Sequence, residues 1–217
     1  MLISALQKRA ATHGPQPFIT YYDGADGSRI ELSAITFANW VDKTANLIAD
    51  LGFDDGEPID IALAESHPGH WVTLVWIAAA WQRGCPVNAG VTGADFLVVG
   101  PGDDRRAEFT VACSLHPLGL GFPVPPEGAV DYREVLMQPD LHDVALDGEA
   151  YEWDGEAARV VEGRDSRVLL RDPVAGWDVV AEALVSPAVG LGSTVVAVNV
   201  SDEQAARIVA DEKVADS

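Results

Sequence analysis

Four segments that begin at Ile35 predict the architecture of this chain: ITFANWVDKTANLIADLG (Ile35–Gly52), IDIALA (Ile59–Ala64), HWVTLVWIAAAWQRG (His70–Gly84) and CPVNAG (Cys85–Gly90). The first segment has the three-and-four apolar spacing of an amphipathic helix, with Thr36 as its cap and Gly52 as its stop. The third is apolar nearly all round, which predicts a buried helix. The second and fourth are short apolar runs typical of strands. Strand, helix, strand is the βαβ unit of a parallel sheet.

The rest of the chain supplies further elements of both kinds. A helix and a β-hairpin with a GADG turn precede the stretch, and strands and helices continue after it. The predicted helices are 2–14, 131–138, 177–192 and 201–213, the strands are 17–24, 28–34, 95–100, 109–115, 166–173 and 193–199, and a loop with a short strand occupies 139–156.

This order predicts an α/β fold, with a mainly parallel sheet flanked by helices on both faces and an N-terminal β-hairpin. We expect one domain over residues 1–217, since the only candidate internal boundary is the proline-rich loop 116–128. With 48% hydrophobic residues, the chain can bury a substantial core. No apolar run reaches the roughly 18 residues of a membrane span, and the N-terminus lacks the apolar core of a secretory signal. The sequence therefore predicts a cytoplasmic protein that does not enter a membrane.

The charge is strongly negative: 34 acidic residues stand against 14 basic ones, giving a formal net charge of −20. Such a surface repels phosphate backbones, so we expect no nucleic-acid partner. Two explanations of the charge stay open. It supports solubility, as in a salty or high-GC host, or it serves to bind a basic partner protein.

Few residues form a pattern typical of catalysis or metal binding. Cys85 and Cys113 lie in strand-like surroundings and are predicted to be buried free thiols. His67 and His70 are three residues apart, but no further ligand has matching spacing, so we predict no metal site. Ser114 follows a strand without the G-x-S-x-G motif. We therefore assign no catalytic residue.

Several local signatures occur in a recognisable order. They are Thr36-Phe37 at a helix start, Ala45-Asn46 within that helix, DGEPIDIAL, WIAAAWQRGCPVNAG, SRVLL, PAVGLGSTVVAVN and RIVADEKV. In this order they resemble the N-terminal region of the adenylate-forming (AMP-binding) enzymes, which include acyl-CoA synthetases, the adenylation domains of peptide synthetases and luciferase. The short, degenerate pattern is also similar to that of a small group of actinobacterial proteins.

The resemblance implies a chemistry for which this chain lacks the groups. These enzymes activate a carboxylic acid on the α-phosphate of ATP and hold the triphosphate in a loop rich in Ser, Thr and Gly that ends in Lys. Here the corresponding stretch is LDGEAYEWDGEAARVVEGRDS (146–166), and it is acidic instead. The carboxylates expected to oppose a polyanion are Asp147, Glu149, Glu152, Asp154 and Glu156.

Other parts of the family pattern are also missing. The sequence stops before the family's ribose-binding Asp, its hinge and its lysine-bearing C-terminal domain, and only GVTGA follows the proline strand where the family has a helix. We therefore predict no cofactor.

The remaining candidate ligand-binding residues are Trp177, Gly190, Gly192 and Ser193. GLGST (Gly190–Thr194) is the nearest approach to a glycine-rich phosphate loop, but it precedes a strand instead of opening a helix, which favours a tight turn. The resemblance places Trp177 near the family's acyl or aromatic pocket. A small apolar or acyl molecule is the ligand that these residues imply.

The preferred hypothesis is a catalytically inactive homologue of adenylate-forming enzymes, a pseudoenzyme that acts as a binding or regulatory protein. One alternative is a subunit of a split acyl- or nucleotide-handling ligase, whose partner supplies the missing half. Another is an acidic protein-interaction module. A protein partner and homo-oligomerisation both stay open.

Overall fold

The computed structural model describes residues 2–142 and 151–215. The chain forms two compact units, each with its own sheet. The first comprises Met1–Ala38, Pro68–Leu74 and Val160–Ser217, and the second Asn39–His67 and Val75–Arg159. The loop 116–128 lies wholly within the second unit. The prediction of a single domain stays a prediction.

The first unit contains a four-stranded sheet in the order β10-β11-β1-β2. The three strands β10, β11 and β1 are parallel, and β2 pairs with β1 as the antiparallel hairpin that the GADG turn predicted. Gly27 in this turn has a φ of +75°, which glycine adopts without strain. The strand bounds are Pro17–Asp23 (β1), Ser28–Ser33 (β2), Arg167–Arg171 (β10) and Ser193–Val198 (β11).

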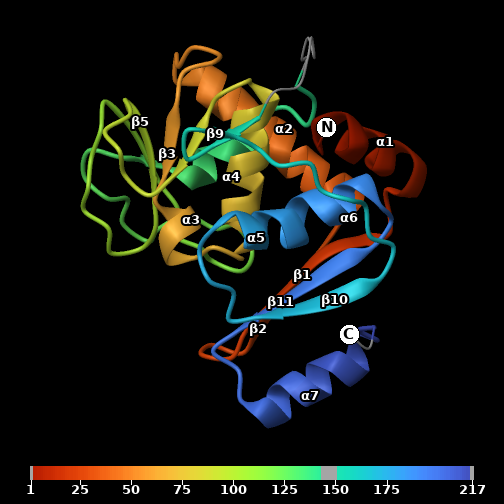
Figure 1. Cartoon of the computed structure of the whole chain (residues 1–217). Coiled ribbons are helices and arrows are strands. Elements are labelled where there is room, and N and C mark those ends of the chain that lie inside the picture. Colours follow the sequence, from red (N-terminus) through yellow and green to blue (C-terminus); the bar gives the residue numbers. More distant parts are fainter. Residues whose placement is uncertain (1, 143–150, 216–217) are drawn as a thin grey trace. The chain divides into compact units, whose positions relative to one another are not determined.

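Helices cover both faces of this sheet (Figure 1). One face carries α1, α5, η2 and α6, and the other carries α7. Under α7, an apolar cluster joins Val195 and Ala197 of the sheet to Ala205 and Ile208 of the helix. The helix bounds are Leu2–His13 (α1), Trp177–Val180 (α5), Ala181–Val185 (η2, a π-helical turn), Ser186–Val189 (α6) and Asp202–Asp211 (α7).

The second unit contains a seven-stranded sheet in the order β7-β6-β5-β3-β4-β8-β9. All neighbouring strands are parallel except the β8–β9 hairpin. The bounds are Ile59–Ile61 (β3), Val87–Ala89 (β4), Phe96–Val99 (β5), Phe109–Ala112 (β6), Val130–Asp131 (β7), Glu152–Trp153 (β8) and Glu156–Ala157 (β9), with the short helices Leu63–Ser66 (α3) and Tyr132–Met137 (η1, a 3-10 helix).

The two long predicted helices are α2 (Ala34–Asp50) and α4 (Trp71–Gln82). Each has residues in both units. The predicted cap at Thr36 is wrong, because α2 begins two residues earlier and the Ser33 hydroxyl accepts the Thr36 amide at 3.2 Å. Gly52 ends the helix with a φ of +82°, as predicted. Buried helix α4 is also confirmed, since Trp71, Trp76 and Trp81 are at most 2% exposed.

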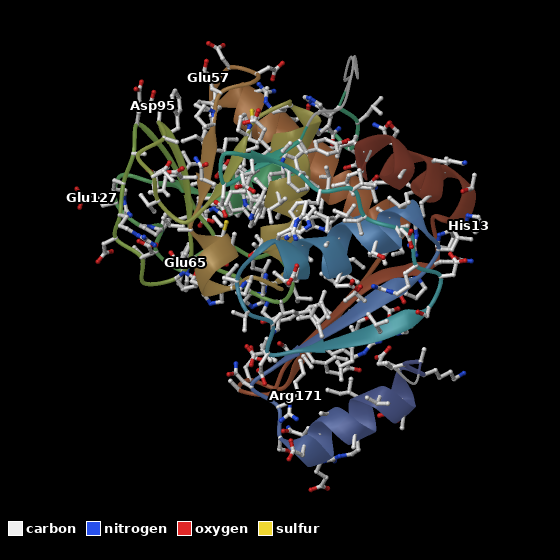
Figure 2. The ribbon with its side chains drawn as sticks, viewed as in Figure 1. His13, Glu57, Glu65, Asp95, Glu127 and Arg171 are labelled. Carbon is white, nitrogen blue, oxygen red and sulfur yellow. The ribbon has the colours of Figure 1, made fainter. Side chains whose placement is uncertain are left out.

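The α/β class with mainly parallel strands and an N-terminal hairpin is confirmed. Two predictions were wrong in detail. The chain forms two sheets instead of one, and the strand expected over 59–64 ends at Ile61, where the chain turns into α3. Figure 2 shows acidic side chains such as Glu57, Asp95 and Glu127 at the periphery of the second unit, as the net charge leads one to expect.

Candidate functional site

The segment directly before β10 stands where the sequence resemblance predicts the end of a phosphate-binding loop. This segment, residues 162–166, pairs with the turn that follows α6 in the first unit. The Gly192 amide donates to the Arg164 carbonyl at 2.7 Å, and the Ser193 amide donates to the Ser166 carbonyl at 3.3 Å. The Arg164 amide donates in turn to the Ser186 carbonyl at 3.2 Å. The chain itself therefore fills the space beside the glycine-rich turn.

Glycine is required in this turn because two backbones approach closely. A Cβ added to Gly192 would lie 2.3 Å from the Ser166 oxygen, and one added to Gly190 would lie 2.2 Å from the Arg164 oxygen. Real Cβ atoms do not approach other atoms so closely, so a larger residue would force the two segments apart. The structure thus accounts for GLGST as a tight packing turn.

The backbone amides of this turn are all used inside the unit. Gly190 donates to the Ser186 carbonyl at 3.0 Å, and Leu191 donates to the Asp165 carboxylate at 2.9 Å. Together with the amides of Gly192 and Ser193, this accounts for every donor from 190 to 193. A phosphate loop works by presenting such amides to the ligand. Here an internal carboxylate and three carbonyls accept them instead.

The guanidinium of Arg164, in the segment 162–166, is also bound within the first unit. Arg164 forms an ion pair with the Glu182 carboxylate, and its Nη2 donates to the Thr194 hydroxyl at 2.8 Å and to the Glu182 carbonyl at 3.1 Å. Burial lowers the pKa of Arg164, because removal from water disfavours the charged form. This guanidinium therefore ties the segment to η2 and is not offered to a ligand.

Three of the predicted ligand-binding residues come together. Gly190, Gly192 and Ser193 share the turn between α6 and β11, and the Ser193 hydroxyl accepts a hydrogen bond from Arg167 at 2.9 Å. Trp177 lies at the opposite end of the helical run, as the first residue of α5, and is partly buried. Ligand binding by these four residues stays a prediction.

The structure describes three of the five acidic residues expected to oppose a triphosphate, and their effect on one stays a prediction. Glu152, Asp154 and Glu156 belong to the β8–β9 hairpin of the second unit, where Asp154 accepts the Ala89 amide at 2.6 Å. Asp147 and Glu149 lie outside the described residues. The carboxylate that does accept an amide of the glycine-rich turn is Asp165.

A second turn, which the sequence did not predict, also binds a carboxylate of the chain. It lies in the second unit, where Asp60 projects from the middle of β3 and is 0% exposed. One of its oxygens, Oδ2, accepts the consecutive amides of Thr92, Gly93 and Ala94 at 2.7, 2.9 and 3.1 Å. The other, Oδ1, accepts the Asn88 side-chain amide and the Thr92 hydroxyl, both at 2.8 Å.

These five donors decide the charge state of Asp60. Burial alone would raise the pKa of the carboxyl, but hydrogen bonds from Asn88 and Thr92 and from the backbone outweigh it, so the pKa lies below its usual value. Three successive amides that converge on one oxygen form an anion-binding nest. The signal in the sequence was an acid inside the apolar run IDIALA, but the small-residue turn GVTGA that holds it begins thirty residues later.

The remaining candidates have structural roles. Cys85 and Cys113 are free and buried, as predicted. The His70 ring accepts the Val72 amide at 3.1 Å at the start of α4. Over residues 2–142 and 151–215, no group of three or more His, Cys, Asp or Glu side chains has the geometry to hold a metal ion. Across the same residues, no helix combines the length and apolarity that a membrane crossing needs.

No protein-family model matches the sequence. A TIGR03089 family protein of Mycobacterium tuberculosis is 32% identical to this chain over 175 residues, which cover 76% of this chain and 66% of the relative. An acyl-CoA synthetase from Brucella canis has a similar structure, with a TM-score of 0.74 and 14% identity over 98% of this chain. The N-terminal domain of FACL13 from Mycobacterium tuberculosis gives a TM-score of 0.69 at 10% identity, again over 98% of this chain.

This chain spans only part of each protein. It covers 46% of the Brucella synthetase and 61% of the FACL13 chain. The TM-scores of 0.74 and 0.69 establish the fold, and at 14% and 10% identity the similarity shows the fold alone. The chain therefore has the fold of the N-terminal domain of the adenylate-forming acyl-CoA synthetases and ligases.

Proposed function

We propose that this protein is a catalytically inactive relative of the adenylate-forming enzymes and acts as a binding or regulatory protein. The observation that supports this most directly is the occupied turn at 190–193. Its four amides donate to Ser186, Arg164, Ser166 and the carboxylate of Asp165. A triphosphate held between this turn and segment 162–166, the end of the stretch that corresponds to the family's phosphate loop, would need those donors free and would meet the negative charge of Asp165.

The chain holds this arrangement firmly. Arg164 is anchored by the Glu182 carboxylate and by the Thr194 hydroxyl, and the Ser186 hydroxyl donates to the Glu162 carbonyl at 2.9 Å. Opening the turn to a nucleotide would break these bonds together with the backbone pairs. Each net hydrogen bond contributes about 1 kcal/mol, so the combined cost is several kcal/mol.

Calorimetric titration with ATP and magnesium tests the proposal, with the Brucella acyl-CoA synthetase as positive control. We expect no saturable heat with this chain and no pyrophosphate release on adding fatty acids. The Asp165→Asn variant separates two causes. If amide occupancy excludes ATP, the variant also fails to bind, whereas binding by the variant alone would assign the exclusion to charge. Sub-millimolar ATP affinity of the natural chain together with pyrophosphate release would overturn the proposal.

The charge of −20 favours a second candidate, an acidic module that binds a basic protein. Attraction between exposed charges weakens as the ionic strength rises, since the screening length falls to about 3 Å at 1 M salt. Binding to an immobilised basic protein such as a histone should therefore weaken steeply with salt. Retention that does not change with salt would contradict this candidate.

A further inference from the structure

Strand β2 forms an open edge of the sheet in the first unit. Within the described residues, its one neighbouring strand is β1. The Ala34 amide, directly after β2, donates to the Gln16 carbonyl before β1 at 2.9 Å, so the backbones of the even-numbered residues of β2 face β1. Since N–H and C=O groups alternate between the two sides of a strand, those of Arg29 and Glu31 face away from the sheet. No hydrogen bond from another described element reaches them.

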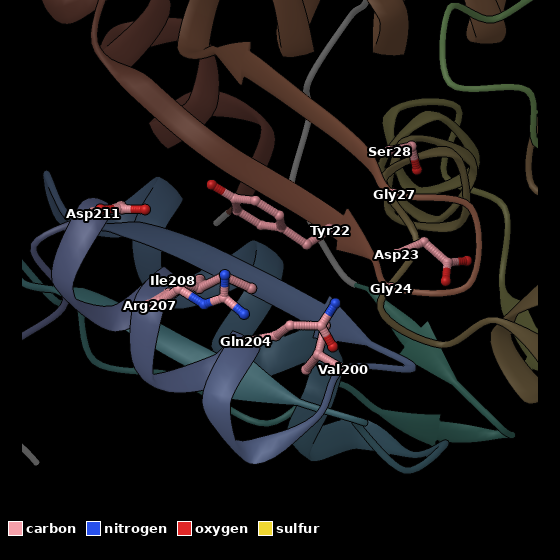
Figure 3. A pocket seen from close by; sticks show the side chains of 10 residues that line it. All are labelled: Tyr22, Asp23, Gly24, Gly27, Ser28, Val200, Gln204, Arg207, Ile208 and Asp211. Atoms are coloured by element: carbon pink, nitrogen blue, oxygen red, sulfur yellow. The ribbon is translucent and has the colours of Figure 1, made fainter.

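The side chains of Arg29 and Glu31 lie on the face of the sheet that α7 covers. Arg29 stands opposite Tyr22 of β1, and its guanidinium lies 5.6 Å from the centroid of the Tyr22 ring. Tyr22 and Ile208 of α7 line one surface depression on this face (Figure 3). Arg29 also donates to Glu31 and to Glu212, both at 2.8 Å. These contacts hold the Arg29 and Glu31 side chains in place at the edge.

Each of these two side chains keeps one polar end unused. Arg29 donates through Nε and Nη2, and Glu31 accepts through Oε2. Neither Nη1 of Arg29 nor Oε1 of Glu31 has a hydrogen-bond partner in residues 2–142 and 151–215. The two side chains are 44% and 33% exposed. The edge therefore offers a donor and an acceptor of opposite charge, two residues apart, beside its open backbone groups.

The order of charges along β2 is complementary to itself. If two copies of the strand pair antiparallel about a two-fold axis at Ile30, Arg29 of each copy lies opposite Glu31 of the other. Both residues present outward backbone groups, so the two pairs are of the hydrogen-bonded kind, in which each pair exchanges two N–H···O bonds. On the opposite face, the half-buried Ile30 side chains of the two copies meet across the axis, where the Cα atoms of a non-hydrogen-bonded pair lie about 4.5 Å apart.

Other registers that keep the backbone bonds bring like charges together. Moving the axis to Arg29 places the two guanidinium groups opposite each other, and moving it to Glu31 does the same to the two carboxylates. Charged residues usually protect an edge strand from pairing, because like charges that meet across strands destabilise the pair. In β2 this protection is absent in the register centred on Ile30, so the charges specify how two copies fit.

We propose that β2 is the contact surface of a symmetric homodimer, in which two four-stranded sheets join through their β2 edges. A strand-to-strand contact buries less than the roughly 1,200 Å² of stable complexes, and two chains of charge −20 repel each other, so the association is weak. We expect a Kd of about 100 µM at about 0.15 M salt. The inference is independent of the function proposed above, because β2 lies outside the turn at 190–193 and the segment 162–166.

Sedimentation equilibrium of the full chain, from about 10 µM to about 1 mM, measures the association. We expect the average mass to rise with concentration from 23.0 kDa toward twice that value. Arg29→Glu makes both charged positions of the edge acidic, and Glu31→Arg makes both basic, so each variant alone should associate at least about tenfold more weakly. An equimolar mixture of the two variants should associate again, because opposite charges then meet at every pair across the axis.

Ile30→Lys is a second kind of variant, which leaves the ion pair between Arg29 and Glu31 in place. It brings two ammonium groups together on the axis and should also weaken association about tenfold. Val174→Lys, at a side chain of the same unit that is 84% exposed, changes the net charge equally and should leave the Kd unchanged. Circular dichroism checks that each variant folds.

Three outcomes would overturn the proposal: a natural chain that stays monomeric at about 1 mM, a mixture of the charge-reversed variants that stays monomeric, or dimers that persist in both variants alone. The last outcome would assign the association to another surface. If the charge-reversed variants do not fold, equal Kd values for Ile30→Lys and Val174→Lys would overturn it instead.

Discussion

Two turns in this protein bind a carboxylate of their own chain, but they do so to very different extents. In the second unit, residues 92–94 and their neighbours give five hydrogen bonds to Asp60, which is wholly buried. In the first unit, the turn at 190–193 gives one amide to Asp165, which is exposed. The first arrangement is a core element, and the second is a surface bond beside a backbone packing site. We therefore expect the two turns to contribute very different amounts to the free energy of unfolding.

The largest effect should come from Asp60→Ala. The change removes the buried carboxylate that accepts three backbone amides, a hydroxyl and a side-chain amide. We expect a loss of about 3–5 kcal/mol in the free energy of unfolding, because each hydrogen bond to a charged group contributes about 1.5–3 kcal/mol and the partly exposed donors regain bonds to water. Urea unfolding followed by circular dichroism measures it. Asp95→Ala, at an exposed acid directly before β5, should change stability by less than about 0.5 kcal/mol. If Asp60→Ala and Asp95→Ala lowered the free energy of unfolding by similar amounts, the turn that binds Asp60 would not be the more stabilising of the two turns.

Gly192→Ala tests whether the turn at 190–193 depends on packing instead of its carboxylate. The new Cβ would meet the backbone oxygens of Ser166 and Arg164, neither of which can move alone. We expect a loss of about 2–3 kcal/mol. Gly100→Ala is the matched control, because the one close contact of its Cβ would be a terminal methyl group of Leu63 at 2.9 Å, with the His67 ring at an ordinary 3.7 Å, and it should cost clearly less. If the control were the more damaging variant in urea unfolding, the close approach of the two backbones would not be what holds the turn.

The pH dependence of stability should separate Asp60 from the surface acids. Its folded pKa is lowered, so its contribution is present above the unfolded pKa of about 3.9 and is lost as pH falls through the folded pKa. Below about pH 4, the free energy of unfolding should therefore fall less steeply with decreasing pH in Asp60→Asn than in the natural protein. The difference should be about 1.4 kcal/mol for each unit by which the folded pKa of Asp60 lies below its unfolded pKa. Arg105 lowers the pKa of Asp103, so Asp103 contributes equally to the pH dependence of stability in both proteins. If the free energy of unfolding fell equally steeply below pH 4 in the two proteins, Asp60 would not have a lowered pKa in the folded state.

The smallest effect should come from Asp165→Asn. The carboxylate accepts one amide at the surface, and the Asn oxygen can still accept it, so we expect a loss below about 0.5 kcal/mol. Differential scanning fluorimetry against Asp104→Asn, an exposed acid without a partner, provides the measurement. A loss as large as that of Asp60→Ala would show that the two turns are equivalent after all.

Much of the fold followed from local patterns. The apolar spacing of 35–52 and the all-round apolar 70–84 each gave a helix within two residues of the observed ends. The division into two sheets did not follow, because strand signals do not tell which strands pair. The sequence predicted only a loop with a short strand where the β8–β9 hairpin lies, although its two-residue turn, Asp154-Gly155, is a hairpin signal.

The site was less predictable than the fold. GLGST was recognised as a tight turn from its position before a strand, but its partner segment 162–166 is a long-range neighbour that no local pattern indicates. The sequence did not predict the anion-binding nest around Asp60 for the same reason. Asp60 and Gly93 are more than thirty positions apart in the sequence, and they come together only when β3 and β5 pair.

Because α2 and α4 each have residues in both units, recombination cannot easily separate the units. The polypeptide enters the second unit within α2, leaves it at His67, re-enters within α4 and leaves again at Arg159. A single genetic crossover can therefore exchange neither unit intact, and two of the four junctions would fall inside a helix. We expect such a chain to evolve by substitution over its whole length, with losses and replacements inside loops, and not by the shuffling of separable modules.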